Sequence, residues 1–104
     1  MMTNKKDHKT AVIGAGSWGT ALALTLASKG YPVALWDHSK DHLDILARDK
    51  ENKKYIPGIM FPENLQPTYD LKQALHSART VCMVVPSHGF RTVYERVYPL
   101  LEEG

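Results

Sequence analysis

Three glycines between two apolar segments constrain this chain more than any other feature of its sequence. The segment 9–30 reads KTAVIGAGSWGTALALTLASKG, so a short β-branched run precedes the glycines and an Ala- and Leu-rich run follows them. This order predicts a buried strand over 10–14, a tight turn, and then a helix over 17–29. Gly30 follows directly, at the position where a glycine commonly ends a helix.

The rest of the chain continues this alternation of strand and helix patterns. Further strands are expected over 31–37, 68–70 and 80–86. Further helices are expected over 39–52, 71–78 and 88–103. Ser39 and Asp70 are placed to be the N-caps of the first two of these helices. The segment 53–67 is expected to be a loop, because it contains three prolines and a glycine.

Such alternation predicts an α/β fold, because strand–helix–strand units make right-handed crossovers and a parallel sheet covered by helices. We expect a Rossmann-type doubly wound parallel sheet in which the strands, numbered along the chain, lie in the order 3-2-1-4. The sheet would be partial, with about four strands where the complete fold has about six. We therefore expect a flexible basic tail over 1–9 and a Rossmann domain over 10–104 that is part of a longer chain.

The glycine spacing fits the fingerprint of dinucleotide-binding folds, in which an acidic residue follows about twenty residues later. Gly14 would permit the tight turn, and Gly16 would let a pyrophosphate approach the backbone. Gly19 would let the helix pack closely on the strand. Asp37 ends the second predicted strand and is the acidic residue of the pattern. The alternative is a glycine turn that binds no ligand.

Composition and charge exclude several other classes of protein. At 104 residues the chain holds one domain at most, and 43% hydrophobic with 23% charged residues is ordinary for a globular protein. The formal net charge of +2 gives no footprint for nucleic acid. A polar N-terminus, short apolar runs and a single cysteine indicate the cytoplasm and no membrane. The five histidines are scattered, so no metal site is predicted.

Three longer motifs add a resemblance to a known family. GAGSWGTALA, YIPG and VVPSHGFR, in this order and spacing, resemble the N-terminal domain of bacterial-type NAD(P)-dependent glycerol-3-phosphate dehydrogenase over residues 12–101. The resemblance implies hydride transfer between NAD(P)H and dihydroxyacetone phosphate, which gives sn-glycerol 3-phosphate for phospholipid synthesis. It also implies that this chain supplies cofactor binding only and no catalytic residue, because the family's lysine and substrate domain would follow Gly104. A homodimer is left open for the full-length enzyme.

The resemblance also assigns cofactor contacts to side chains other than the glycines. Ser17 and Trp18 would contact the cofactor from the turn, His38 would lie beside the adenosine ribose, and Tyr55 would line the adenine side. Each side chain has a plainer alternative. Ser17 would be a helix N-cap, His38 an exposed loop residue, and Tyr55 a packing residue beneath a loop. Trp18 would be a core or a surface aromatic residue, of which the core is favoured.

Further residues follow the fourth predicted strand. The resemblance places Phe90, together with Pro86, beside the cofactor, and the alternative for Phe90 is packing beneath a loop. His88 lies where ligands bind in this fold, after the carboxyl end of a strand. The family's acid–base residues lie elsewhere, so His88 is expected to be a loop or substrate-side residue and not a catalytic one.

Cofactor preference and function class each keep an alternative. Asp37 favours NAD by bonding the ribose 2′-hydroxyl, whereas His38 and Lys40 favour the 2′-phosphate of NADP. We expect NADP(H) to be accepted, with NAD(H) as the alternative. Two other function classes are a different oxidoreductase of the same superfamily, against which YIPG and VPSHGFR argue, and a non-enzymatic dinucleotide-sensing module.

Overall fold

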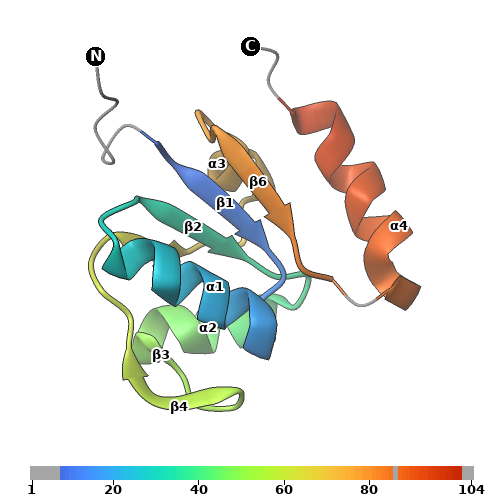
Figure 1. The fold of residues 1–104 in the computed structure, drawn as a ribbon. Coiled ribbons are helices and arrows are strands. Elements are labelled where there is room, and N and C mark those ends of the chain that lie inside the picture. The colour runs from blue at the N-terminus through green and yellow to red at the C-terminus, as the bar shows by residue number, and fades with distance from the viewer. Residues whose placement is uncertain (1–7, 86, 102–104) are drawn as a thin grey trace, which may run out of the picture.

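A parallel sheet of four strands organises the molecule, as seen in a computed structural model that describes residues 8–85 and 87–101. The strands lie in the order β5-β2-β1-β6, and each neighbouring pair is parallel (Figure 1). Their bounds are β1 Thr10–Ile13, β2 Val33–Trp36, β5 Leu65–Pro67 and β6 Thr80–Met83. Because β5 and β6 are the third and fourth strands of this sheet along the chain, the predicted Rossmann-type order is confirmed.

Helices cover both faces of this sheet. The first two helices, α1 Ser17–Ser28 and α2 Lys40–Asp49, lie on one face, and the short helix α3 Leu71–Leu75 lies behind the other (Figure 1). The last helix, α4 Ser87–Val97, runs beside β6 and passes into a 3₁₀ turn at Tyr98–Leu100. This arrangement is the one that right-handed crossovers produce in a doubly wound fold.

Short-range signals in the sequence set several of the helix ends. The Ser39 side chain accepts a hydrogen bond from the His42 N–H at 3.2 Å, and Asp70 accepts one from the Gln73 N–H at 3.2 Å. Both residues are therefore the predicted N-caps. Gly30 has a φ of +98°, which is the left-handed conformation expected for a glycine just past a helix.

The core lies between the central strands and the helices that cover them. All four residues of β1 and all four residues of β2 are buried. Trp36 is 1% exposed, donates its indole N–H to the Tyr69 carbonyl at 2.9 Å, and packs under the Arg96 guanidinium at 5.1 Å. Trp36 is therefore a core residue. From α2, Leu43 and Leu46 complete the core.

The third strand and the segment before it differ from the sequence prediction. The strand is β5 at 65–67 and not 68–70, because its backbone pairs with β2 three residues earlier than its composition suggested. The predicted loop over 53–67 contains most of a hairpin, β3 Glu51–Asn52 with β4 Ile56–Met60. β4 was not predicted because it contains Pro57 and Gly58, and neither residue type is typical of a strand.

The fourth strand is shorter than predicted and less buried than its apolar sequence indicates. All four residues of β6 are partly exposed, although a continuous apolar run such as 80–86 is typical of a strand buried on both faces. In the described part of the chain β6 pairs only with β1, so its other edge is not covered by a strand. Among the described helices, none is both long enough and apolar enough to cross a membrane.

Candidate functional site

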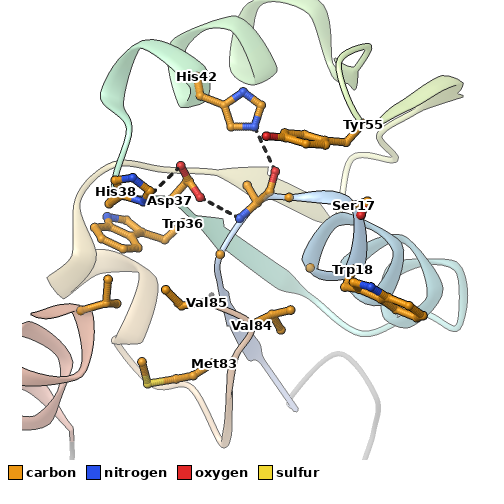
Figure 2. Close-up of a pocket in the computed structure, with 15 residues that line it drawn as sticks. Ser17, Trp18, Trp36, Asp37, His38, His42, Tyr55, Met83, Val84 and Val85 are labelled. Carbon is orange, nitrogen blue, oxygen red and sulfur yellow. Dashed lines mark hydrogen bonds and ion pairs between the residues drawn. The ribbon is translucent and has the colours of Figure 1, made fainter. Parts of the chain in front are cut away.

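A cavity of about 620 Å³ opens where β1, β2 and β6 end. Polar side chains of the β2–α2 region and the hairpin lie on one side of the glycine turn, and apolar side chains that follow β6 lie on the other (Figure 2). The carboxyl edge of the sheet, at the switch point between β1 and β6, is the place where open α/β sheets bind ligands. The lining residues from the turn and α1 are Gly14, Ala15, Gly16, Ser17, Trp18 and Gly19. The others are Trp36, Asp37, His38, His42, Tyr55, Met83, Val84, Val85 and Val93.

Two of the three glycines are required by the protein's own packing. Gly14 has a φ of +122°, and a Cβ there would overlap the Val84 carbonyl oxygen. A Cβ at Gly19 would overlap the Gly14 carbonyl oxygen, which shows how closely α1 approaches the end of β1. The structural roles predicted for these two glycines, a tight turn and a close approach of helix to strand, are therefore confirmed.

Gly16 differs from both of its neighbours in the fingerprint. Its φ of −80° and ψ of −161° suit any residue, and a Cβ placed on it would meet no described protein atom within 4 Å. Neither backbone conformation nor packing therefore requires a glycine here. The space beside the Gly16 backbone opens into the cavity, where a ligand could approach more closely than a side chain would allow.

The N-terminus of α1 presents backbone N–H groups to the cavity, and within the described part of the chain no side chain caps them. The N-cap is Gly16 and not Ser17. Ser17, Trp18 and Gly19 form the first turn, which contains no acidic residue that would compete for the N–H groups. The positive end of the helix dipole adds to these donors, so the end of α1 suits an anion.

Trp18 projects from this first turn and is 81% exposed. Trp18 is therefore not a core residue, and its exposure fits both a surface aromatic residue and the predicted cofactor contact. An indole ring that lines a cavity yet stays exposed is available to contact a ligand.

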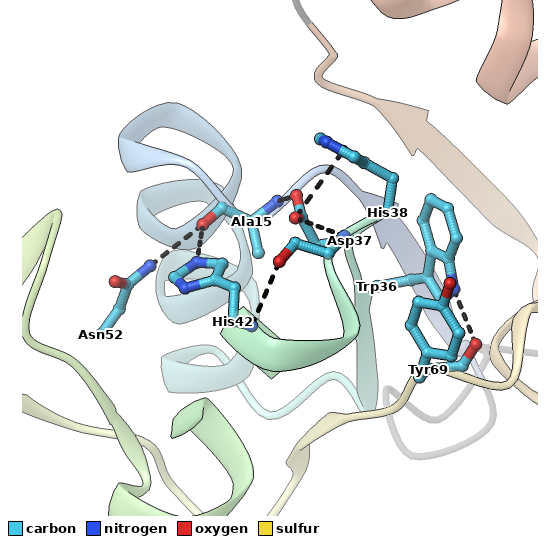
Figure 3. Close-up of polar contacts among 8 residues, drawn as sticks. Ala15, Trp36, Asp37, His38, His42, Asn52 and Tyr69 are labelled. Carbon is cyan, nitrogen blue, oxygen red and sulfur yellow. Dashed lines mark hydrogen bonds and ion pairs between the residues drawn. The ribbon is translucent and has the colours of Figure 1, made fainter. Parts of the chain in front are cut away.

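Asp37 is bonded to the glycine turn. One carboxylate oxygen accepts from the Ala15 N–H at 2.9 Å and the other accepts from the Ser39 N–H at 3.1 Å (Figure 3). Its side chain is only 14% exposed. Asp37 therefore joins the end of β2 to the end of β1, a role that the sequence pattern did not reveal.

His38 and Lys40, both considered for a 2′-phosphate, are placed differently. The His38 ring lines the cavity, is 68% exposed, and has its Nδ1 3.7 Å from an Asp37 oxygen. Lys40 bonds Asp44 at 2.9 Å on the outer side of α2 and does not line the cavity. The pKa of Lys40 is raised by this hydrogen bond and by the Asp44 charge. Of these two candidates for contact with a 2′-phosphate, only His38 lines the cavity.

Tyr55 reaches the cavity from the hairpin, as the resemblance implied for a residue near a nucleotide base. Its ring meets His42 edge-on at a centroid separation of 5.7 Å, and the Lys54 ammonium lies 5.2 Å from its centroid. His42 lines the same wall but was not predicted as a site residue. The only sequence signal for His42 is its spacing of four residues from His38.

Phe90 does not line the cavity. It stacks on Tyr94 along α4 at a centroid separation of 5.9 Å and is 41% exposed. From α4, Val93 lines the cavity instead, together with residues that follow β6. Pro86 lies outside the described residues. Within the residues that the structure describes, no cluster of His, Cys, Asp and Glu side chains is arranged to hold a metal ion.

Residues 9–104 match the model of a protein family described as NAD-dependent glycerol-3-phosphate dehydrogenase N-terminus. The chain belongs to this family. The resemblance carried by the GAGSWGTALA, YIPG and VVPSHGFR motifs is thereby confirmed.

Individual members of the dehydrogenase family resemble the chain closely. The glycerol-3-phosphate dehydrogenase (NAD(P)+) of Desulfotalea psychrophila is 59% identical over 91 residues, which are 88% of this chain and 27% of that protein. The corresponding enzyme of Shewanella oneidensis is 48% identical and covers 98% of this chain and 30% of its own length. The crystal structure of glycerol-3-phosphate dehydrogenase from Coxiella burnetii superposes with a TM-score of 0.91 at 44% identity. It covers 96% of this chain and 30% of its own chain, so this chain spans less than a third of these relatives.

Proposed function

We propose that this chain is the cofactor-binding part of an NAD(P)-dependent glycerol-3-phosphate dehydrogenase. The whole enzyme would transfer hydride between NAD(P)H and dihydroxyacetone phosphate. The observation that carries this proposal is Gly16, the one fingerprint glycine that the protein's own packing does not explain. A glycine is needed here if a bound ligand lies so close to the backbone that it would collide with a Cβ. A pyrophosphate at a helix N-terminus is such a ligand group.

The residues at the cavity fit an NAD(P) molecule part by part. The N–H groups at the start of α1 would donate to the pyrophosphate, and Trp18 would pack beside it. His38 would lie near the adenosine ribose, and Tyr55 would contact the adenine. The apolar wall of Met83, Val84 and Val85 would exclude water from the other part of the cofactor. The bound cofactor supplies the hydride, and these residues bind and orient it.

The proposal for cellular location is the cytoplasm. The single cysteine, which is partly buried and makes no disulfide in the described structure, suits a reducing compartment.

A substitution at Gly16 tests the binding role without breaking the fold. Gly16→Val places methyl groups in the open space beside the turn, at a cost of about 1 kcal/mol for a poorer N-cap residue. We expect the variant to fold and to show no measurable affinity for NADPH or NADH by isothermal calorimetry. Thr25→Val is the matched control, because it adds the same side chain at an exposed position of the same helix. Equal affinity of Gly16→Val and the control would contradict the proposal.

A further inference from the structure

Two side chains from outside the glycine fingerprint converge on one carbonyl oxygen of the turn. The Ala15 carbonyl accepts from His42 Nε2 at 2.9 Å and from Asn52 Nδ2 at 3.1 Å (Figure 3). Since a carbonyl only accepts, Nε2 of His42 carries the proton that it shares. Nothing in the motif GAGSWG identifies either partner, because they come from α2 and from the hairpin.

Asn52 is bonded through both ends of its amide. Its Nδ2 also donates to Thr20 Oγ1 at 2.8 Å, and its Oδ1 accepts from the Tyr55 N–H at 3.3 Å. This set of partners fixes the orientation of the amide, because the nitrogen faces a carbonyl and the oxygen faces an N–H. Asn52 is 0% exposed, so it cannot touch a ligand in the cavity. Any effect that it has on binding must act through the backbone that it holds.

The bonds at Ala15 determine which way the next N–H points. In a planar trans peptide the C=O and the following N–H point in opposite directions. Because Asn52 and His42 hold the Ala15 C=O on their side, the N–H of Gly16 is directed away from them. On the preceding peptide, Asp37 holds the Ala15 N–H at 2.9 Å. Both peptide groups that flank Ala15 are thus held by side chains.

The hydrogen bonds to the Ala15 carbonyl restrict a peptide that Gly16 would otherwise leave free to rotate. A glycine leaves the approach to the backbone open, but it also leaves the Ala15–Gly16 peptide free to rotate, because glycine populates many conformations. A rotated peptide would present its carbonyl oxygen to an anion and repel it. Donors that are fixed before the ligand arrives bind it more tightly, because less conformational freedom is lost on binding.

We propose that Asn52 and His42 are positioning residues for the dinucleotide: they hold the Ala15 carbonyl so that the Gly16 N–H stays aimed at the pyrophosphate. This role deepens the proposed function and rests on it. The alternative is that Asn52 only stabilises the fold by joining α1 to the hairpin.

A second asparagine in this chain provides a matched control. Asn64 Nδ2 donates to the Ala27 carbonyl at 2.8 Å and to the Tyr31 carbonyl at 2.9 Å, at the far end of α1. Asn52→Ala and Asn64→Ala therefore each remove an amide that makes two donor contacts to the region of α1. Both should lower the free energy of unfolding, measured in urea. Only Asn52→Ala should also weaken NADPH binding. The expected loss of affinity is roughly tenfold, because the Gly16 N–H would no longer be aimed at the charged pyrophosphate. Asn64→Ala should keep a Kd within about twofold of that of the unsubstituted chain.

The experiment measures the affinity of NADPH for the unsubstituted chain and for the two asparagine variants, each as folded protein. Absence of NADPH binding by the unsubstituted chain would overturn the proposed function and this role of Asn52 with it. Binding by the unsubstituted chain together with equal affinities of the two asparagine variants would overturn only the positioning role.

A pair of His42 variants decides the question if Asn52→Ala does not fold. His42→Phe keeps a ring against Tyr55 but has no donor, whereas His42→Gln keeps an N–H donor within reach of the Ala15 carbonyl. We expect His42→Phe to weaken NADPH binding by roughly fivefold and His42→Gln to restore most of that loss. Equal affinities in these two variants would overturn the positioning role.

Discussion

At the scale of single residues, one fingerprint contains glycines that are needed for different physical reasons. Gly14 and Gly19 are required by the chain itself, whereas Gly16 faces open space. A comparable division separates the polar residues at the end of β2. Asp37 is directed onto the backbone of the turn, and His38 is exposed beside it. Residue types that look alike in a motif thus divide into those that build the site and those that face the open cavity.

The exposed ring of His38 should distinguish the two cofactors. His38→Ala should raise the ratio of the Kd for NADPH to the Kd for NADH by roughly threefold. Only NADPH has a 2′-phosphate to which the ring can donate a hydrogen bond. The measurement is the ratio of the two Kd values by calorimetry. An unchanged ratio would mean that His38 does not contact the 2′ position.

Asp37→Ser, unlike His38→Ala, should affect both cofactors. The shorter serine side chain cannot reach both backbone N–H groups that the carboxylate now holds. Loss of the bond to Ala15 should loosen the turn and weaken NADPH and NADH alike, each by roughly fivefold. Tighter NADPH binding with unchanged NADH binding would contradict this, and would mean instead that the carboxylate mainly repels the 2′-phosphate.

At the scale of helices and strands, the β1–turn–α1 unit could be predicted because local rules determine it. A β-branched run, a glycine at positive φ and an Ala-rich helix each have their own sequence signal. The β3–β4 hairpin could not be predicted, because Pro57 and Gly58 argue for a loop. Asn52 was missed too, because it was assigned to the end of the predicted helix over 39–52, whereas the structure ends that helix at Asp49 and places Asn52 in β3. The position of β5 depends on pairing with β2, which no local pattern reports.

The packing of the glycine turn against the backbone just after β6 gives a prediction about stability. Gly14→Ala forces a side chain into positive φ and against the Val84 carbonyl, and should lower the free energy of unfolding by at least about 3 kcal/mol. Gly16→Ala should lower it by about 1 kcal/mol or less, because the added methyl meets no atom. Urea unfolding followed by circular dichroism measures both. Similar losses in the two variants would contradict the division of roles among the glycines.

At the scale of the whole molecule, the fold gathers its ligand-facing groups at one edge of the sheet. The cavity lies where β1, β2 and β6 end, with the N-terminus of α1 in its wall. The sequence predicted this edge, because the carboxyl ends of parallel strands meet on the same side. It did not predict that Phe90 would stack on Tyr94 along α4 instead, since the direction of a helix after a strand depends on packing.

The composition of this cavity predicts binding without turnover. Reduction of a ketone phosphate needs a proton donor beside the developing alkoxide and cationic groups for the phosphate. His42 and Tyr55 line the cavity and can donate a proton, but among the described residues that line it there is no lysine or arginine to hold a substrate phosphate. The 104-residue chain should therefore bind NADPH but show no oxidation of NADPH, followed at its absorbance band, when dihydroxyacetone phosphate is added. Substrate-dependent oxidation that Gly16→Val abolishes would show that catalytic residues lie within this chain.

The most direct test of the central claim is a titration of the isotope-labelled chain with NADPH, followed by the backbone amide resonances in NMR. We expect the largest shifts at Gly16, Ser17 and Trp18, because their N–H groups would face the pyrophosphate. A second cavity of about 230 Å³ at the other end of β1 and β6, lined in part by Thr10 and Thr80, provides an internal comparison. Shifts that centre on Thr10 and Thr80, or no shifts at the start of α1, would contradict the assignment of the glycine turn as the dinucleotide site.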